Sequence, residues 1–436
     1  PPEMSVSEFA EAELHLSSES AAMPGLMDLS VTEYCRGILD AVSDPSIETV
    51  VAMMAYQTGK TSTILSALMY HIAYDPCPIM IVMPNDSMCA SLSRDRIAPM
   101  IRDSPILRGT IAEPKSRTTG NTISHKTFKG GSLTLASAQS PANLSARSIR
   151  LVCFDEVYRY PASSGSEGDP VTLGKRRSVS FWNRKILMTS TPTIRGESRI
   201  EKAYEDSDQR KFFVPCEGCG EFQVLEWANV KWENKDPETA RYQCEHCEKS
   251  WTDQERLRAV RLGEWRATAV KPGVAEFHLS GLYSPFISLS EAVAEFRAAK
   301  GHPDMLRAWT NTYECKSFEE QSQRVDPNEI IERREEYSDA CPDGVLVVTA
   351  GVDVQADRLE ATVCGHGMAD EMWFLDHRIF YGSPASDDLW QELDDILMEP
   401  WRLPSGKDLR TSCTMVDSRY ETQRVYAFCR RMAANR

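Results

Sequence analysis

A Gly-Lys-Thr triplet near the start of the chain is the residue pattern most specific for a chemical function. Gly59, Lys60 and Thr61 follow an apolar run at residues 50–54 and open an amphipathic helical pattern. This order of strand, turn and helix is typical of a P-loop, whose backbone N–H groups and helix N-terminus hold phosphates. The lysine of such a loop contacts the β- and γ-phosphates of ATP, and the threonine hydroxyl binds Mg²⁺. The residues predicted to contact the nucleotide are Gln57, Thr58, Gly59, Lys60 and Thr61.

The loop departs from the general motif at one position. Met54 stands where the pattern G-x-x-x-x-G-K-[ST] has its first glycine. A lone Gly-Lys-Thr also occurs in ordinary turns before helices. The triplet by itself therefore supports a phosphate site and a plain turn equally.

Two acids at the end of an apolar run supply a partner motif. Residues 151–154 are apolar and lead into Asp155 and Glu156. In P-loop ATPases the first acid holds Mg²⁺ through water, and the second activates the attacking water as a general base. A strand that ends in a solvated acidic turn is the alternative interpretation. Because the two motifs occur in the expected order, the sequence favours an ATPase with Asp155 and Glu156 in these roles.

A third segment fits the same domain. Residues 186–188 are apolar and run into the hydroxyl residues Thr189, Ser190 and Thr191. In helicase-like motors such a strand lies beside the acidic strand, and its hydroxyl residues sense the γ-phosphate. If the segment stood alone, a Thr-Pro turn would be the better interpretation. The sequence does not identify an arginine finger, for which Arg147, just before the acidic strand, is a candidate.

Four of the thirteen cysteines form two C-x-x-C pairs, a spacing that can close a tetrahedral Zn²⁺ site. The interval between the pairs leaves room for a hairpin built on residues 224–227 and 230–232, and His246 is an alternative ligand. A redox C-x-x-C is the rival interpretation, but two pairs without a thioredoxin-like context favour a structural zinc. The predicted ligands are Cys216, Cys219, Cys244 and Cys247.

A β-rich segment from residue 345 carries the last set of candidate residues. It is expected to form a meander of strands at residues 345–354, 359–365 and 371–380. In the first strand the even-numbered positions, Leu346 included, are apolar. Asp353 therefore lies on the opposite face, where a metal could approach.

A second acid follows a later strand. Residues 411–416 are expected to form a strand that ends in Asp417 and precedes a helix at residues 421–431. Two such strands side by side would bring both carboxylates onto a pair of Mg²⁺ ions about 4 Å apart, the arrangement that cleaves phosphodiesters. Glu360, on the neighbouring strand, is a reserve ligand. If only the spacing of Asp353 and Asp417 is considered, two acids in turns at strand ends are the better interpretation than a metal site.

The overall charge argues weakly against a nucleic-acid partner, because the 436 residues carry a formal net charge of −15 at pH 7. The segment between residues 171 and 200, however, contains seven basic residues and a single acid, Glu197. On charge alone a solvated loop is the better interpretation of this segment. The seven are Lys175, Arg176, Arg177, Arg184, Lys185, Arg195 and Arg199.

Targeting signals are not evident in the sequence. We find no apolar run long enough to span a bilayer, so we expect no membrane partner. The first residues lack the basic start and apolar core of a secretory signal, which makes a cytoplasmic location the default expectation.

Together these segments resemble the large terminase subunits of lambda-type bacteriophages. Large terminases often replace the first P-loop glycine, so Met54 fits this family. Beyond the P-loop, the matching stretches are Pro24-Gly25-Leu26-Met27, Asp155-Glu156-Val157-Tyr158-Arg159-Tyr160-Pro161, Thr189-Ser190-Thr191-Pro192-Thr193, Glu197-Ser198-Arg199-Ile200, Ala350-Gly351-Val352-Asp353-Val354-Gln355 and Val416-Asp417-Ser418.

The resemblance implies an α/β fold with a RecA-like P-loop ATPase domain, a zinc-knuckle region and an RNase H-like nuclease domain that is incomplete at its C-terminus. It also favours the nuclease interpretation of the late acids. The implied catalytic residues are Lys60, Glu156, Asp353 and Asp417. The expected divisions are an N-terminal helical segment at 1–45, the ATPase domain at 46–211, the zinc-knuckle region at 212–265, a helical linker at 266–344 and the partial nuclease domain at 345–436.

The function implied by the resemblance is ATP-driven movement of double-stranded viral DNA into a procapsid, with a metal-dependent endonuclease that cuts concatemers. The implied cofactors are ATP and Mg²⁺, beside the Zn²⁺ predicted from the cysteines. The implied partners are DNA, a small terminase subunit, the procapsid portal and further copies in a ring, in the host cytoplasm and transiently at the portal. Because family members usually extend past this sequence, we expect a third nuclease carboxylate outside it, and inefficient DNA cleavage by this chain.

Two other functions match parts of the pattern. A DNA helicase or restriction-type translocase would share the first domain, but it needs a second RecA-like domain after residue 200. This chain has the cysteine pairs and an acid-bearing meander there. A zinc-stabilised DNA-binding scaffold with an inactive P-loop is the third candidate, and DNA-stimulated ATP hydrolysis distinguishes it from the other two.

Overall fold

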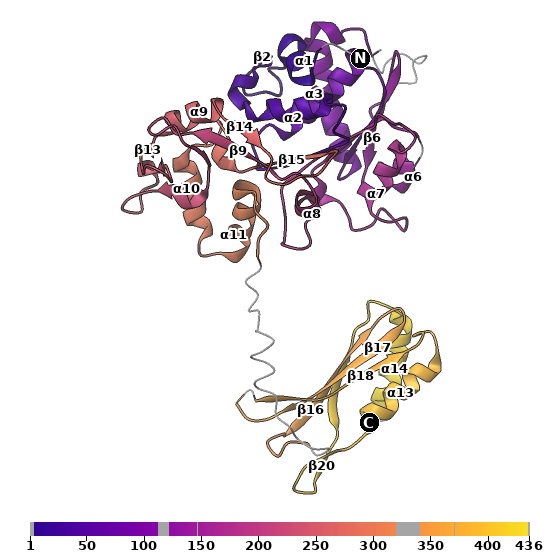
Figure 1. Cartoon of the computed structure of the whole chain (residues 1–436). Coiled ribbons are helices and arrows are strands. Elements are labelled where there is room, and N and C mark those ends of the chain that lie inside the picture. Colours follow the sequence, from indigo (N-terminus) through magenta and orange to yellow (C-terminus); the bar gives the residue numbers. More distant parts are fainter. Residues whose placement is uncertain (1–3, 112–121, 146, 320–340, 370, 435–436) are drawn as a thin grey trace. The chain divides into compact units, whose positions relative to one another are not determined.

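The chain forms two compact units, residues 1–321 and 322–436, each of which is described by itself (Figure 1). The computed structural model describes residues 4–111, 122–145, 147–319, 341–369 and 371–434. Within these ranges, no helix is both long enough and apolar enough to span a lipid bilayer.

A ten-stranded sheet organises the first unit, and three of its strands are the apolar runs that lead into the predicted motifs. These three, β3, β8 and β7, lie side by side in parallel, and β4 and β6 continue the parallel part of the sheet. All five residues of β7 are buried, as expected for a strand covered on both faces. The sheet order is β10 (Phe222–Val224), β9 (Arg210–Pro215), β15 (Val274–Leu279), β3 (Thr49–Met54), β8 (Lys185–Ser190), β7 (Leu151–Asp155), β4 (Pro78–Met83), β6 (Gly131–Ser137) and β5 (His125–Phe128), with β14 (Glu264–Arg266) beside β9.

Helices cover both faces of this sheet. Val50, Ala52 and Met54 of β3 pack with α1 (Val6–Glu13), α2 (Tyr34–Ser43) and α3 (Lys60–Ala73). Val51 and Met53 point the other way and pack with α6 (Pro141–Ser145), α7 (Pro170–Lys175) and α8 (Arg199–Glu205). Other elements are β1 (His15–Leu16), β2 (Gly25–Leu26), α4 (Asp86–Ser91), η2 (Leu92–Ile97), α5 (Ala98–Asp103), α9 (Asp253–Arg261), α10 (Leu289–Ala299), α11 (Pro303–Trp309) and η9 (Thr310–Glu314).

The ten-stranded sheet extends beyond residue 211, the boundary expected for its domain. β15 lies in parallel beside β3 over six residue pairs, from Val274 with Thr49 to Leu279 with Met54. β9, β10 and β14 continue the sheet on the far side of β15. The segment expected as a helical linker at 266–344 therefore begins with a central strand, and α10 and α11 follow it in the same unit.

The cysteine-bearing segment does not form the hairpin expected from residues 224–227 and 230–232. β10 pairs with β9 in the large sheet. β11 (Val230–Lys231) instead joins β12 (Arg241–Gln243) and β13 (Ser250–Trp251) in a separate three-stranded sheet. The two expected hairpin partners belong to different sheets because each finds its partner elsewhere in the chain.

The second unit is a four-stranded sheet covered on one face by two helices. Its order is β18 (Met372–Tyr381), β17 (Arg358–His366), β16 (Val347–Val354) and β21 (Thr411–Val416). The predicted meander and late strand are confirmed, but Leu346 precedes the strand and is 54% exposed. The even-numbered residues of β16 pack with α13 (Asp387–Met398), which the sequence analysis missed, and α14 (Thr422–Ala434). A short hairpin joins β19 (Trp401–Arg402) and β20 (Asp408–Leu409).

A carboxyl group is buried in the first unit on β15. The side chain of Glu276 is fully buried. Burial raises the pKa of Glu276 well above its ordinary value, and the nearby Asp208 carboxylate raises it further, whereas the positive charge of Lys175 opposes the rise. The carboxyl group therefore stays protonated in the folded protein at pH values where the unfolded chain ionises it.

This difference predicts how stability depends on pH. As pH rises above the ordinary glutamate pKa, the unfolded state loses its proton first, so Glu276 destabilises the fold progressively. Glu276→Gln should raise the thermal midpoint of unfolding by about 2 °C or more at pH 8 and by much less near pH 4. Scanning calorimetry at both pH values measures this. Glu205→Gln, at an exposed position on α8, should show no such pH dependence.

Candidate functional site

The Gly-Lys-Thr triplet lies in the strand–turn–helix context that the sequence predicts. β3 ends at Met54 and α3 begins at Lys60. The Lys60 ammonium donates hydrogen bonds to the carbonyl oxygens of Met54 and Ala55, both at 2.8 Å. Met54 stands at the position that usually carries glycine. Its side chain is fully buried in the core, while its backbone carbonyl oxygen accepts the hydrogen bond from Lys60.

Two residues of the loop have positive φ angles. Gly59 has φ of +88°, a conformation that favours glycine, and a Cβ there would lie in tight contact with the Cys35 sulfur, at 3.1 Å. Gln57 has φ of +54° without being glycine. The loop therefore contains one position where the sequence meets the backbone requirement and one where it does not.

Asp155 lies at the buried end of β7. Its Oδ1 atom accepts hydrogen bonds from the Thr189 hydroxyl at 2.6 Å and from the Glu156 backbone N–H at 3.0 Å. Burial raises the pKa of Asp155, and the hydrogen bond from Thr189 opposes the rise. The sequence analysis missed this role of Thr189; the signal that could have found it is its place directly opposite Asp155 in the parallel register.

Glu156 and Lys60 line the same cavity, which has a volume of about 650 Å³. Glu156 has a left-handed backbone conformation, and its Oε2 atom lies 3.4 Å from Nε of Arg159. Burial lowers the pKa of Lys60, whereas the nearby acids Asp155 and Glu156 act in the opposite direction. The other walls of the cavity include Gln57, Thr58, Gly59, Thr61, Pro24, Met27, Arg96, Met100 and Phe286.

The predicted sensor strand, β8, lies between β3 and β7. The expectation that it lies beside the acidic strand is confirmed. Ser190 accepts a hydrogen bond from the Tyr158 N–H at 3.0 Å and donates one to the Thr191 carbonyl at 2.8 Å. Its hydroxyl group is thus bonded to the loop that follows Asp155 and Glu156.

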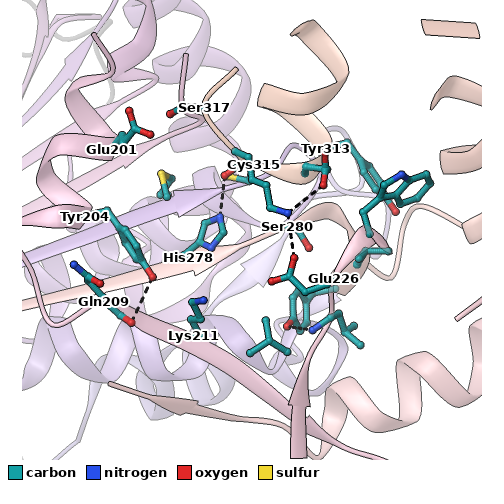
Figure 2. A pocket seen from close by; sticks show the side chains of 18 of the residues that line it. Glu201, Tyr204, Gln209, Lys211, Glu226, His278, Ser280, Tyr313, Cys315 and Ser317 are labelled. Carbon is teal, nitrogen blue, oxygen red and sulfur yellow. Dashed lines mark hydrogen bonds and ion pairs between the residues drawn. The ribbon is translucent and has the colours of Figure 1, made fainter. Parts of the chain in front are cut away.

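A second cavity, of about 440 Å³, lies on the side of the sheet covered by α8 (Figure 2). Residues 310–318, which we call the strap, form one wall. His278 at the end of β15 donates from Nε2 to the Cys315 carbonyl at 2.8 Å, and this bond fixes the strap against the sheet. The strap also contacts the P-loop, because the Tyr56 N–H donates to the Thr312 carbonyl at 2.9 Å.

Arg147 is not near the phosphate loop of its own chain. Its guanidinium contacts the ring of His125 on β5. β5 is five places from β3 in the sheet order, which corresponds to about 24 Å at the usual strand spacing. Within one chain the structure therefore does not bring this candidate arginine to the site.

The basic segment at residues 171–200 does not form a continuous free surface. Arg184 pairs with Glu48 at 2.9 Å and Arg199 with Asp169 at 3.0 Å. Lys185 donates to two backbone carbonyls. These side chains stabilise the fold, so the segment gives little support for a DNA-binding surface.

The four predicted cysteine ligands come together. Their sulfur atoms all lie within 4.8 Å of one another, with Cys216 and Cys247 at 3.7 Å and Cys219 and Cys244 at 4.0 Å. Backbone N–H groups of Gly218 and His246 point at the Cys216 and Cys244 sulfurs, at 3.3 and 3.4 Å. The His246 ring instead contacts the neighbouring Glu245.

The acids of the second unit share one face of its sheet. Asp353 and Glu360 are direct cross-strand partners on β16 and β17. β21 lies in parallel beside β16, and the N–H of Asp417 donates to the Val352 carbonyl at 2.9 Å. Among the described residues, however, only the cysteines form a group of three or more potential ligands within 4.8 Å. The carboxylates of the second unit thus lie on the same face of the sheet, but their oxygen atoms are not close enough together to form such a group.

Comparison with known families identifies the chain that forms these two units. A family profile described as "Phage terminase large subunit gpA, ATPase domain" matches residues 21–265. A second, "Terminase large subunit gpA, endonuclease domain", matches residues 274–436. The chain belongs to the gpA family of phage terminase large subunits. The resemblance stated from the motifs is confirmed, and this terminase has an ATPase and an endonuclease that serve the packaging of viral DNA.

Individual relatives agree with the family match. The terminase large subunit of Escherichia phage lambda is 28% identical over 433 residues, which cover 93% of this chain and 67% of that protein. The corresponding protein of Enterobacteria phage P21 is 27% identical over 432 residues, with the same shares covered. Among solved structures, the large terminase of bacteriophage HK97 matches 90% of this chain and 71% of its own, at 12% identity and a TM-score of 0.46. A large terminase from a thermophilic bacteriophage has a TM-score of 0.36 at 12% identity, covering 93% of this chain and 79% of its own.

Proposed function

We propose that residues 55–61, Asp155 and Glu156 form the ATP-hydrolysing site of this terminase. The observation that carries the proposal is the strand order β3, β8, β7, which puts the P-loop and both acids at the same edge of a parallel sheet. The two motif strands are two strand spacings apart, roughly 10 Å, which suits groups that act on opposite sides of a phosphate. Lys60 and Glu156 line one cavity, in support of this role.

Each residue has a distinct role in this proposal. The Lys60 ammonium, now bonded to two backbone carbonyls, would turn to the β- and γ-phosphates. Thr61 and Asp155 would hold Mg²⁺, which when bound neutralises phosphate charge. The bonds from Thr189 and the Glu156 N–H, both to Oδ1, fix the Asp155 carboxylate for this role. Glu156 would accept a proton from the attacking water, and Ser190 and Thr191 would respond to the γ-phosphate.

Two substitutions test the ATP site. Lys60→Ala should abolish nucleotide binding and turnover, because the loop loses its main positive charge. Glu156→Gln should bind ATP normally but lower kcat by about 10²–10⁴-fold, because only the general base is removed. DNA-stimulated phosphate release and binding of a fluorescent ATP analogue measure the two effects. Normal turnover by Glu156→Gln would refute the assignment, and Glu197→Gln serves as the control for an acid outside the site.

We also propose that Asp353 and Asp417 hold the divalent metal ions of the endonuclease, with Glu360 as a further ligand. All three lie on the sheet face that α13 and α14 leave uncovered. The side-chain amide of Gln355 donates to Asp353 at 2.8 Å, and Arg358 pairs with Glu360 at 2.6 Å, so these acids are oriented by neighbours. Hard oxygen ligands on adjacent strands suit Mg²⁺ or Mn²⁺.

Plasmid cleavage tests the nuclease assignment. In Mg²⁺ or Mn²⁺, the chain should cut slowly, as expected above, and Asp353→Asn and Asp417→Asn should each abolish this cutting. ATP hydrolysis should stay within about twofold, since the two sites lie in separate units. Asp357→Asn, in the exposed turn between β16 and β17, is the matched control and should cut like the parent protein. Unchanged cutting by the Asp353 variant would rule out this site.

We propose that the cysteine cluster holds one structural Zn²⁺. Four sulfurs at the corners of a tetrahedron with Zn–S bonds of about 2.3 Å are about 3.8 Å apart, and the Cys216–Cys247 and Cys219–Cys244 separations are close to that value. The N–H···S hydrogen bonds from Gly218 and His246 favour thiolates, which are the form that binds zinc. The residues present therefore fit the ion.

Elemental analysis tests the zinc proposal. Protein washed with a weak chelator should retain about one equivalent of Zn²⁺ per chain, because a four-thiolate site is closed. Cys216→Ser should lose the metal and lower the thermal midpoint, whereas Cys413→Ser, an exposed cysteine of the other unit, should change neither. A metal-free parent protein would contradict the proposal.

The partners and the location follow from the family and are proposals for this chain. We infer that it acts on double-stranded DNA as a ring of identical subunits, with a small terminase subunit and the procapsid portal, in the host cytoplasm. The related lambda and P21 proteins are terminase large subunits, which supports this inference.

A further inference from the structure

The P-loop of this terminase holds a backbone conformation that its own sequence does not favour. Gln57 has φ of +54°, a region that non-glycine residues rarely adopt, and Met54 replaces the first glycine of the motif. Such a conformation persists only where the surrounding structure holds it. One such contact lies within the loop, where the Thr58 hydroxyl donates to the Ala55 carbonyl, and others come from outside it.

Ser284 provides one of these contacts. Its side chain is fully buried, and its hydroxyl donates a hydrogen bond of 2.6 Å to the carbonyl oxygen of Gln57. The same hydroxyl accepts a hydrogen bond from the Phe286 N–H at 3.2 Å, which fixes its direction. In a trans peptide the C=O and the following N–H point in opposite directions. Holding the Gln57 carbonyl at Ser284 therefore aims the Thr58 N–H the other way, where a phosphate can accept it.

Arg256 holds the segment that carries Ser284. This arginine of α9 is 1% exposed, and its guanidinium donates to the carbonyl oxygens of Leu282, Ser284 at 3.2 Å and Ile287 at 3.0 Å. Asp253, one turn earlier on the same helix, neutralises it at 2.7 Å. A buried guanidinium bonded to three carbonyls of one short segment acts as a clamp on that segment.

A second tether joins the loop at the preceding residue. The Tyr56 N–H donates to the Thr312 carbonyl in the strap, and His278 holds the strap at Cys315 (Figure 2). Neighbouring residues of the loop are thus bonded to two different segments. Both segments come from parts of the chain more than two hundred residues after the loop.

We propose that Ser284, held in place by Arg256, is a positioning residue for ATP binding that holds the unfavourable backbone conformation at Gln57. The inference rests on the proposal that residues 55–61 hold the phosphates. Without the Ser284 hydroxyl, the Gln57 carbonyl loses this hydrogen bond, and nucleotide binding must supply more of the ordering of the Gln57–Thr58 peptide. The loss therefore falls on binding and not on the chemical step.

Kinetics of Ser284→Ala test the proposal. The KM for ATP and the Kd of an ATP analogue should rise about five- to tenfold, as expected for one lost hydrogen bond, while kcat changes less than about twofold. Ser178→Ala is the matched control, because Ser178 is equally buried and its hydroxyl also donates to a backbone carbonyl, that of Lys175 at 2.8 Å. Both variants lose one buried hydroxyl, so a general loss of stability would affect them alike. Unchanged KM in Ser284→Ala, or an equal change in Ser178→Ala, would overturn the proposal.

A second pair of variants tests the clamp. Arg256→Lys keeps the positive charge but cannot donate to three carbonyls at once, so it should raise KM in the same direction as Ser284→Ala. Arg258→Lys, at an exposed position on the same helix, should not. Adding Ser284→Ala to Arg256→Lys should raise KM little further, because both act through the Gln57 carbonyl. Fully multiplicative effects on KM would refute the shared route.

Lys60→Ala, assayed in parallel, separates the proposed ATP site from the positioning role of Ser284. If Lys60→Ala still binds ATP, the P-loop assignment fails. If Lys60→Ala loses binding while Ser284→Ala binds normally, only the positioning role is refuted.

Discussion

The parallel pairing of β3 on both of its edges is the constraint on which the first unit depends. β8 on one side and β15 on the other leave β3 no free hydrogen-bonding edge along most of its length. Residues of β3 that alternate between the two faces are buried in two different cores. The end of this strand is therefore a rigid point, and a loop that starts there can present a lysine at a fixed position above the sheet.

Local patterns in the sequence predict several strands and the phosphate loop of this unit. They do not predict features that depend on contacts between distant parts of the chain. Runs such as residues 151–154 predict buried strands because every residue is apolar, and the Gly-Lys-Thr triplet before a helical pattern predicts the phosphate loop. The place of β15 depends on a pairing with a strand far earlier in the chain, which no local pattern encodes. Thr189 and Ser284 are likewise defined by long-range contacts, and neither serine nor threonine is unusual at a strand end or in a loop.

The two candidate metal sites differ in how far the sequence predicts their geometry, because one depends on local turns and the other on side-chain positions on several strands. Each cysteine pair sits in a tight turn whose own N–H groups point at sulfur, so the sequence spacing nearly determines the geometry. Two of the acids of the second unit lie on neighbouring strands and the third directly follows another strand. Their like charges repel one another where no cation lies between them. For these residues the sequence predicted the shared face, because strand alternation is local. The separation of the carboxylates depends on side-chain positions that the strand pattern does not encode.

The late arrival of β15 also affects how the chain can be divided and how it folds. Residue 49 of the phosphate-loop strand pairs with residue 274. During synthesis, β3 can therefore pair with β15 only after more than two hundred further residues have been made. Closing so large a loop is slow compared with forming the local strand–helix units. The two family profiles meet between residues 265 and 274, on the N-terminal side of this strand. A fragment cut at that junction would keep Lys60, Asp155 and Glu156 but expose one edge of β3, and an exposed parallel edge is a site for aggregation.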